Sequence, residues 1–179
     1  MLWEMVVGIK DEYAVLVPDY AGEALESFNV NGHELPWRKI PTVTPFIDPK
    51  RKKQKPRGDI EYLTWGAIVL NQRAYQVLQD ALSPFGQFLP LSCLGRAHYF
   101  YNVTAHHAVV DYDKSEKIGE VITKPAFLPT VIPSGICIFK DKLTANVAIY
   151  LNDETKNALE KLITANKITG LYFIPAGSF

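Results

Sequence analysis

The sequence predicts an α+β fold with a mainly antiparallel or mixed sheet and two principal helices, at about 71–82 and 153–165. Short apolar runs with the twofold periodicity of strands recur along the chain, and only those two segments carry the spacing of an amphipathic helix. Strands and helices do not alternate regularly, which argues against a parallel α/β sheet. With 179 residues, 47% of them apolar, the chain is long enough to bury its own core.

The first third of the chain is richer in prolines and less regularly patterned than the rest, and we place a domain boundary after residue 58. Residues 1–58 are predicted to form a β-rich N-terminal lobe, with a β-hairpin made by the apolar runs 3–9 and 13–17. Five prolines between 36 and 56 predict an exposed, meandering connection, because proline donates no backbone hydrogen bond. Residues 59–179 are predicted to form an α+β core.

Both predicted helices begin at a residue that caps helix N-termini well. Asn71 follows the buried strand candidate 67–70 and precedes the first helix. The second helix starts at Asn152 or Asp153, and its early acidic residues suit the positive end of the helix dipole. These caps are the sharpest element boundaries in the sequence.

The other strands of the core are predicted from shorter runs. They are 88–91, 99–103, 108–112, 136–140, 147–151 and 171–174. Aromatic residues alternate through 99–103, and we expect 108–112 to pair with that strand. Prolines at 125, 129 and 133 predict a loop between 112 and 136.

The net charge of zero is an average over two unlike parts. The chain has 19 Lys and Arg against 19 Asp and Glu, but six of the basic residues lie in one octet. They are Lys50, Arg51, Lys52, Lys53, Lys55 and Arg57. The remainder carries 13 positive against 19 negative residues, and such an acidic body suits a basic partner because opposite potentials speed association. We take the octet, together with Trp37, as the candidate partner-binding residues.

The common catalytic motifs are absent from the sequence. It contains no Gly-rich phosphate loop, no His-Glu-x-x-His and no Gly-x-Ser-x-Gly. Cys93 with His98 resembles a thiolate and its base only in residue type, and no third group can be chosen to orient them. The best metal candidates are His106, His107, Asp111 and Asp113. Adjacent strand residues point to opposite faces, so we assign no catalytic, cofactor-binding or metal-binding residue and predict no enzyme.

The sequence predicts a cytoplasmic protein with no membrane partner. Its longest unbroken apolar runs, such as 147–151, are far shorter than the roughly 20 residues of a membrane-spanning helix. The N-terminus has no basic segment or cleavage pattern of an export signal. Cys93 and Cys137 are isolated in the sequence, which predicts free thiols in a reducing compartment.

Six short blocks follow one another between residues 59 and 175. They are Asp59-Ile60, the segment 67–74, Phe88-Leu89-Pro90-Leu91, the aromatic segment 99–103, Val110-Asp111-Tyr112-Asp113 with Ser115, and the segment 168–175. In this order they resemble a family of bacterial immunity proteins of polymorphic toxin systems, the eleventh numbered immunity family, formerly a domain of unknown function. One departure is Asn71, where the family usually has serine; both residues cap helices.

The resemblance implies a non-enzymatic protein that binds and neutralises a cognate toxin or effector protein in the producing cell. It covers about two thirds of the chain and carries over no toxin-contacting residue. The alternative is a small nucleic-acid-associated regulator that uses the basic loop 50–57. We rank it lower because no aromatic residues lie within the octet to stack on bases.

Overall fold

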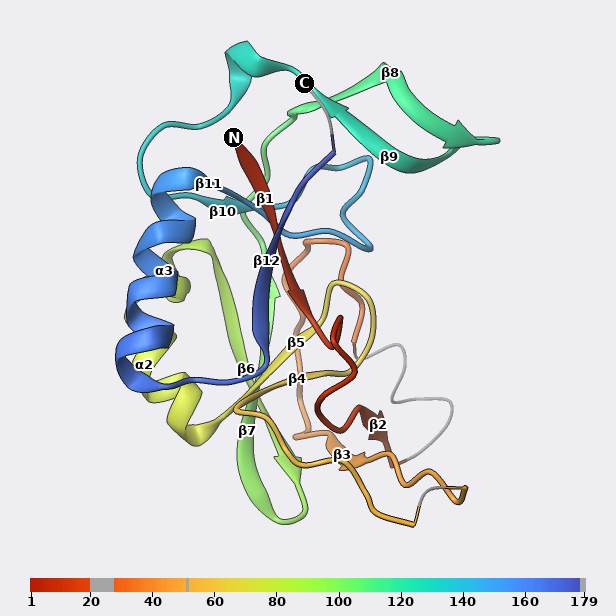
Figure 1. Cartoon of the computed structure of the whole chain (residues 1–179), viewed down its shortest axis with the longest axis vertical. Helices are drawn as coiled ribbons and strands as arrows, with labels where there is room; N and C mark the ends of the chain where they lie inside the picture. The colour runs from red at the N-terminus through yellow and green to blue at the C-terminus, as the bar shows by residue number, and fades with distance from the viewer. Residues whose placement is uncertain (20–27, 51, 178–179) are drawn as a thin grey trace.

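The computed structural model describes residues 1–19, 28–50 and 52–177. Within these residues, the strands form a four-stranded sheet, a six-stranded sheet and a separate two-stranded ribbon. The two α-helices of this part lie side by side against one side of the sheets (Figure 1). The predicted α+β class, with a largely antiparallel and partly mixed sheet, is confirmed. None of the described helices is long and apolar enough to cross a membrane.

The four-stranded sheet is antiparallel throughout and joins the beginning of the chain to its end. Its strands, in spatial order, are β10 (Ile138–Phe139), β11 (Tyr150–Asn152), β1 (Leu2–Val7) and β12 (Leu171–Pro175). One face of β1 presents Trp3, Met5 and Val7 to the core beneath the helices. Because strand side chains alternate, Glu4 and Val6 lie on the opposite face.

The six-stranded sheet is mixed, because its β3–β6 pair is parallel and its other pairs are antiparallel. In spatial order its strands are β2 (Leu16–Pro18), β3 (Thr42–Pro45), β6 (Gly86–Cys93), β7 (Arg96–Val103), β5 (Ile68–Asn71) and β4 (Ile60–Tyr62). The ribbon consists of β8 (Val110–Ile118) and β9 (Val121–Phe127) and projects from the body (Figure 1).

Both helices begin at the asparagine caps that the sequence predicts. Helix α2 spans Gln72–Leu82, and the Asn71 side chain accepts a hydrogen bond of 2.8 Å from the Ala74 amide. Helix α3 spans Asp153–Asn166, and Asn152 accepts 2.9 Å from the Thr155 amide. These bonds satisfy amides that have no partner inside the helix. The predicted positions of both helices are confirmed.

Residues 1–58 contribute strands to both sheets. β1 pairs with β11 and β12, and β3 pairs with β6, so backbone hydrogen bonds join the first third of the chain to residues 59–179. The main core cluster reflects this, since Met5 packs with Leu78 of α2 and Leu159 of α3. The change in sequence texture at residue 58 is therefore not a break in the hydrogen-bonded sheets.

The predicted hairpin between 3–9 and 13–17 is wrong. β1 and β2 lie in different sheets, because both edges of β1 are already occupied by β11 and β12. Between them Gly8 and Asp11 adopt positive φ angles of 75° and 52°, which turn the chain away. β2 pairs instead with β3.

The structure also corrects two further predictions, the pairing of the segment 108–112 and the irregular course of the connection 36–58. The segment 108–112 does not pair with β7, whose two edges are taken by β5 and β6; its second half begins β8, which pairs with β9. The proline-rich connection 36–58 also contains β3, an interior strand whose Val43 is fully buried. Pro41 and Pro45 lie just before and at the end of β3, so only a short ladder is needed between them.

Asp59 fastens the start of α2 to the end of α3. Its carboxylate accepts hydrogen bonds from Asn71 Nδ2 (3.0 Å), Arg73 Nη1 (2.8 Å), and both the amide and the hydroxyl of Thr169 (3.0 Å each). Arg73 also donates to the backbone carbonyl of Asn166. Burial raises the pKa of Asp59, but these hydrogen bonds outweigh burial and hold that pKa below its usual value of 3.8.

We expect Asp59→Asn to lower the free energy of unfolding by about 2 kcal/mol at pH 7, because an amide loses one acceptor oxygen and the charge that strengthens these bonds. Urea unfolding followed by circular dichroism measures it. The advantage of the wild type should shrink as the pH falls below 3.8 and through the lower folded-state pKa, where the carboxylate is protonated. Asp113→Asn, at an exposed position, is the control. Equal losses in the two variants would contradict the assignment.

Candidate protein-binding surface

The fold divides the basic octet into exposed side chains and side chains tied in ion pairs. Lys50, Lys52 and Lys53 are exposed, and Arg51 lies outside the described residues. Lys55 and Arg57 each bind a carboxylate, that of Asp11 and that of Glu61 respectively. The octet therefore presents less free charge to a partner than the sequence alone suggests.

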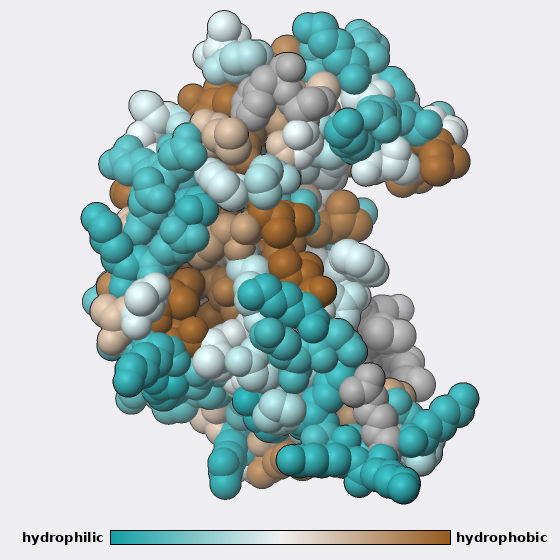
Figure 2. All heavy atoms as spheres, in the orientation of Figure 1, coloured by the Kyte–Doolittle hydropathy of each residue, from teal (hydrophilic) through white to brown (hydrophobic). Residues whose placement is uncertain are grey.

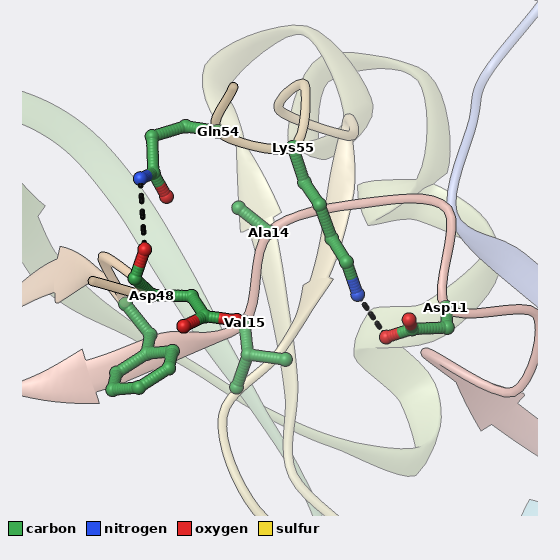
Figure 3. A pocket seen from close by; sticks show the side chains of 7 residues that line it. Asp11, Ala14, Val15, Asp48, Gln54 and Lys55 are labelled. Atoms are coloured by element: carbon green, nitrogen blue, oxygen red, sulfur yellow. Dashed lines mark hydrogen bonds and ion pairs between the residues drawn. The ribbon is translucent and has the colours of Figure 1, made fainter. Parts of the chain in front are cut away.

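Lys55 lies beside a small pocket between the octet and the N-terminal segment (Figure 3). Its ammonium group points to the carboxylate of Asp11, and Gln54 donates a 3.3 Å hydrogen bond to the carbonyl of Asp48. The pocket has a volume of about 220 Å³, and its apolar wall is formed by Ala14, Val15 and Phe46. These contacts hold the end of the octet against the body of the protein.

The Arg57 side chain contacts Glu61, Cys93 and His98, a cluster that no sequence motif predicts. Its guanidinium binds the Glu61 carboxylate through Nε and Nη2, and Nη2 also lies 3.3 Å from Cys93 Sγ and 3.2 Å from His98 Nε2. Arginine only donates hydrogen bonds, so His98 Nε2 accepts, and its Nδ1 proton is donated to the Arg96 carbonyl at 3.2 Å. Cys93 and His98, which we did not assign as a catalytic pair, thus both lie against the Arg57 guanidinium.

The cluster lacks the electrostatics of a cysteine nucleophile and its base. Burial raises the pKa of Cys93 and lowers the pKa of His98, which favours a neutral thiol beside a neutral imidazole. A reactive cysteine instead has a lowered pKa and a path to substrate, whereas Cys93 is fully buried. We interpret the cluster as the inner end of the Arg57–Glu61 ion pair.

Trp37 packs into the core cluster of the six-stranded sheet. Its ring stacks on Phe100 with 5.6 Å between centroids and meets Phe28 edge-on at 5.4 Å. The indole is half-buried, so most of its contacts lie within the protein. Its role in partner binding stays a prediction.

The two adjacent histidines are directed to different neighbours. His106 Nε2 lies 3.1 Å from the Gly32 carbonyl, whereas the His107 ring packs edge-on against Phe139 at 5.1 Å. Asp111 forms an ion pair with Lys114 at 3.3 Å. Across the ranges 1–19, 28–50 and 52–177, no group of three or more His, Cys, Asp or Glu is arranged to hold a metal ion.

The molecule is hollowed on the side away from its helices. Figure 2 shows a recess in the body beside the projecting β8–β9 ribbon, with apolar atoms at its base. Two loops meet near this base, the loop joining β4 to β5 and the loop preceding β11, since both line the same two pockets. A concave, partly apolar face is the kind of surface that partner proteins occupy.

Trp65 is the most prominent side chain of these two loops. It is 69% exposed, an unusual state for a large aromatic ring, and it lies beside the exposed Val147 (47%) and near Ile9 (50%). Tyr62 meets its ring edge-on, with centroids 6.2 Å apart. We call Ile9, Tyr62, Trp65 and Val147 the Trp65 surface.

The backbone beneath Trp65 holds the indole outward. The Ala67 amide bonds to the Thr64 carbonyl at 3.1 Å, closing a turn around Trp65 and Gly66. Gly66 has a φ of 67°, and a Cβ there would lie 3.3 Å from the Asn146 carbonyl, so this close approach of the two loops favours glycine. The ring projects between a pocket of about 50 Å³ and one of about 310 Å³.

Sequence reasoning missed the Trp65 surface, although one signal was present. Trp65 and Gly66 lie between two buried β-runs, and an aromatic side chain in so short a turn has little chance to reach the core. The nearness of Val147 and Ile9 has no sequence signal, because 82 residues separate Trp65 from Val147. No protein-family model and no curated protein matches this chain.

Proposed function

We propose that this protein binds and neutralises a cognate bacterial toxin or effector protein through its hollowed face. The observation that carries the proposal is the exposure of Trp65 within an apolar surface. Tryptophan is among the residues that most often dominate the binding energy of protein interfaces. The resemblance of residues 59–175 to the immunity family supplies the class of partner.

The shape of the face supports a macromolecular partner. The β8–β9 ribbon stands at one side of the hollow, and near its turn Ile118 and Val121 are 75% and 68% exposed. A partner seated in the hollow reaches both the ribbon and the Trp65 surface, which enlarges the contact toward the roughly 800 Å² per side of a stable complex. Inhibition by such a protein needs a rigid complementary surface and no catalytic group.

Nucleic-acid binding through the basic loop 50–57 is the second-ranked proposal. Lys55 and Arg57 already bind carboxylates, which leaves three described lysines of the octet exposed. Three exposed lysines give a weaker, salt-sensitive attraction to phosphates than six basic side chains would. Filter binding to single- and double-stranded nucleic acid at low salt distinguishes this proposal from the first.

The decisive experiment uses the product of the gene immediately upstream of this one. We expect its toxin domain to arrest cell growth when expressed alone, co-expression of this protein to restore growth, and the two purified proteins to co-elute. Failure of both rescue and co-elution would overturn the proposed function.

Within that complex, Trp65→Ala should weaken binding about 30-fold, because about 2 kcal/mol is the typical loss at an interface hot spot. Calorimetry with the purified toxin domain measures the change. The matched control is Ile136→Ala, which also removes an exposed apolar side chain (47%), but beside the start of α3, where Gly135 and Cys137 bond to Asn152 and Thr155. An unchanged affinity for Trp65→Ala would exclude the Trp65 surface from the interface.

A further inference from the structure

Glu4 is a carboxylate placed inside an apolar surface. It lies in the middle of β1, opposite Tyr150 of β11 and Ile174 of β12 in the sheet register. Its side chain is on the face of β1 that points away from the helices, and it lines the same narrow pocket as Tyr62 and Trp65. Glu4 is thus a charged member of an otherwise largely apolar pocket wall.

The Glu4 carboxylate has no partner within residues 1–19, 28–50 and 52–177: no hydrogen bond and no ion pair reaches it there. The two buried carboxylates of the described residues, those of Glu61 and Asp141, both have partners. Glu61 binds Arg57, and Asp141 accepts three backbone amides at 2.7 to 2.9 Å, including those of Val109 and Val110. Burial raises the pKa of the Glu4 carboxyl group, and the Glu4 charge in turn raises the pKa of the Tyr150 hydroxyl opposite it.

A half-buried carboxylate without a partner costs stability, and that cost is recovered when a complementary group arrives. An ionised carboxylate only accepts hydrogen bonds, so the complementary group is a donor, and a cation is the strongest one. The adjacent Trp65 and Tyr62 rings attract cations through their faces, and Val147 suits the aliphatic stem of a long basic side chain. Lys10, which follows Ile9 in the sequence, does not supply this cation, because its ammonium group lies over the Tyr172 ring, 4.6 Å from the ring centroid.

We propose that Glu4, Tyr62, Trp65 and Val147 form a receptor for a lysine or arginine side chain that the partner protein inserts into the Trp65 surface. This inference rests on the proposed function and adds the chemistry of the partner's central contact. It agrees with the overall charge, because the chain outside the basic octet carries six more acidic than basic residues. Glu4 sets the charge of the inserted side chain, and the rings and Val147 set its length and shape.

The receptor is tested without the toxin, using N-acetyl-lysine methylamide and N-acetyl-arginine methylamide as probes and the neutral norleucine analogue as reference. We expect the cationic probes to shift the Trp65 indole N–H resonance saturably at pH 7.5 and low salt. Glu4→Gln keeps the shape of the side chain and removes its charge, and it should weaken this binding about fivefold or more. Glu120→Gln, at an exposed position between β8 and β9, is the matched control and should leave binding unchanged.

Three results would overturn the receptor: no saturable shift with either cation, equal binding of the norleucine analogue, or equal binding by Glu4→Gln in a protein whose unfolding midpoint matches the wild type. The same variants separate the two proposals. If the toxin domain binds wild type and Glu4→Gln with equal affinity, the receptor is wrong and the proposed function stands. If the cationic probes bind but the toxin is not neutralised, the proposed function is wrong and the cation site stands.

Discussion

Replacing Gly170 with alanine should destabilise the protein by about 4 kcal/mol. Gly170 lies between α3 and β12 with a φ of 97°, outside the conformations that other residues adopt easily. A Cβ at this position would lie 1.9 Å from the Ile60 carbonyl oxygen, which is backbone and cannot move aside as a side chain does. The close approach is held by the hydrogen bond from the Ile60 amide to the Thr169 carbonyl at 2.9 Å.

Gly95→Ala separates the steric clash from the cost of the positive φ. Gly95 also has a positive φ, of 71°, but nothing lies within 4 Å of a Cβ built there. We therefore expect Gly95→Ala to cost only about 1 kcal/mol in the free energy of unfolding. Urea unfolding of both variants measures the difference. A loss at Gly170 within about 1 kcal/mol of that at Gly95 would show that the β4–β12 junction is looser than described.

The second large effect is the pH dependence that Lys140 imposes on stability. Lys140 is fully buried, and its ammonium group donates hydrogen bonds to the carbonyls of Val30 and Ala145. It forms no ion pair with a carboxylate in the described part of the chain. Burial lowers the pKa of Lys140 from 10.5 to about 8, because the charged amine loses its hydration.

The folded protein therefore releases the Lys140 proton at a lower pH than the unfolded chain does. Between pH 8 and 10.5 the unfolded state binds more protons, so this residue's contribution to stability rises with pH across that window and is lost as the pH falls through 8. This difference between the unfolded and folded pKa values of Lys140 corresponds to a gain of about 3 kcal/mol in the free energy of unfolding between pH 8 and 10.5. The pKa values of Cys93, Cys137 and the buried Tyr150 are raised by folding, so these groups lower stability as the pH rises and oppose the Lys140 trend. Their contribution cancels when the wild type is compared with a variant that lacks only the Lys140 amine.

Lys140→Met provides that difference, since it keeps the aliphatic chain and removes the titrating amine. We expect the free energy of unfolding of the wild type to rise relative to Lys140→Met by about 2 kcal/mol between pH 7 and pH 9.5. Chemical unfolding at a series of pH values measures it. A difference that stays constant with pH would contradict the assigned titration. In this variant the Val30 and Ala145 carbonyls lose a hydrogen-bond donor, and the resulting loss of stability is the same at both pH values.

Lys140 also supports the segments next to the Trp65 surface. It ties Val30, which lines the larger pocket beside Trp65, to the loop that carries Val147. His106 fixes the neighbouring Gly32 carbonyl in the same segment. These bonds hold the segment of Val30 and Gly32 in place beside the loop that carries Val147. A surface ordered in this way lowers the entropic cost of the proposed binding.

The local elements of this fold were predicted well because their signals are local. The Asn71 and Asn152 caps, and the apolar face that follows each of them, depend on residues within one helix. Most strands were located for the same reason. Several partners of those strands were not, because pairing depends on which edges are free. Both edges of β1 are filled by β11 and β12, which are distant in sequence, and β7 is flanked by its hairpin partner β6 and by β5.

The candidate functional residues divide in the same way between local signals and contacts made by folding. The sequence showed the basic octet, but two of its members are neutralised by Asp11 and Glu61, one of which is 44 residues away. Glu4 carries no sequence signal, and the only signal for Trp65 is its place in a short turn between two β-runs. Their significance appears only when folding places a charged and an aromatic side chain in one pocket.

The sequence by itself determined the class of the fold, both helices with their caps, and the uneven division of charge between the octet and the body, since composition and periodicity act within a few residues. Tertiary structure alone decided the sheet order, the tight junction at Gly170, the buried Lys140 and the surface around Trp65. Each of these depends on the distance between atoms far apart in the chain, where burial and steric exclusion, and not local preference, set the energy.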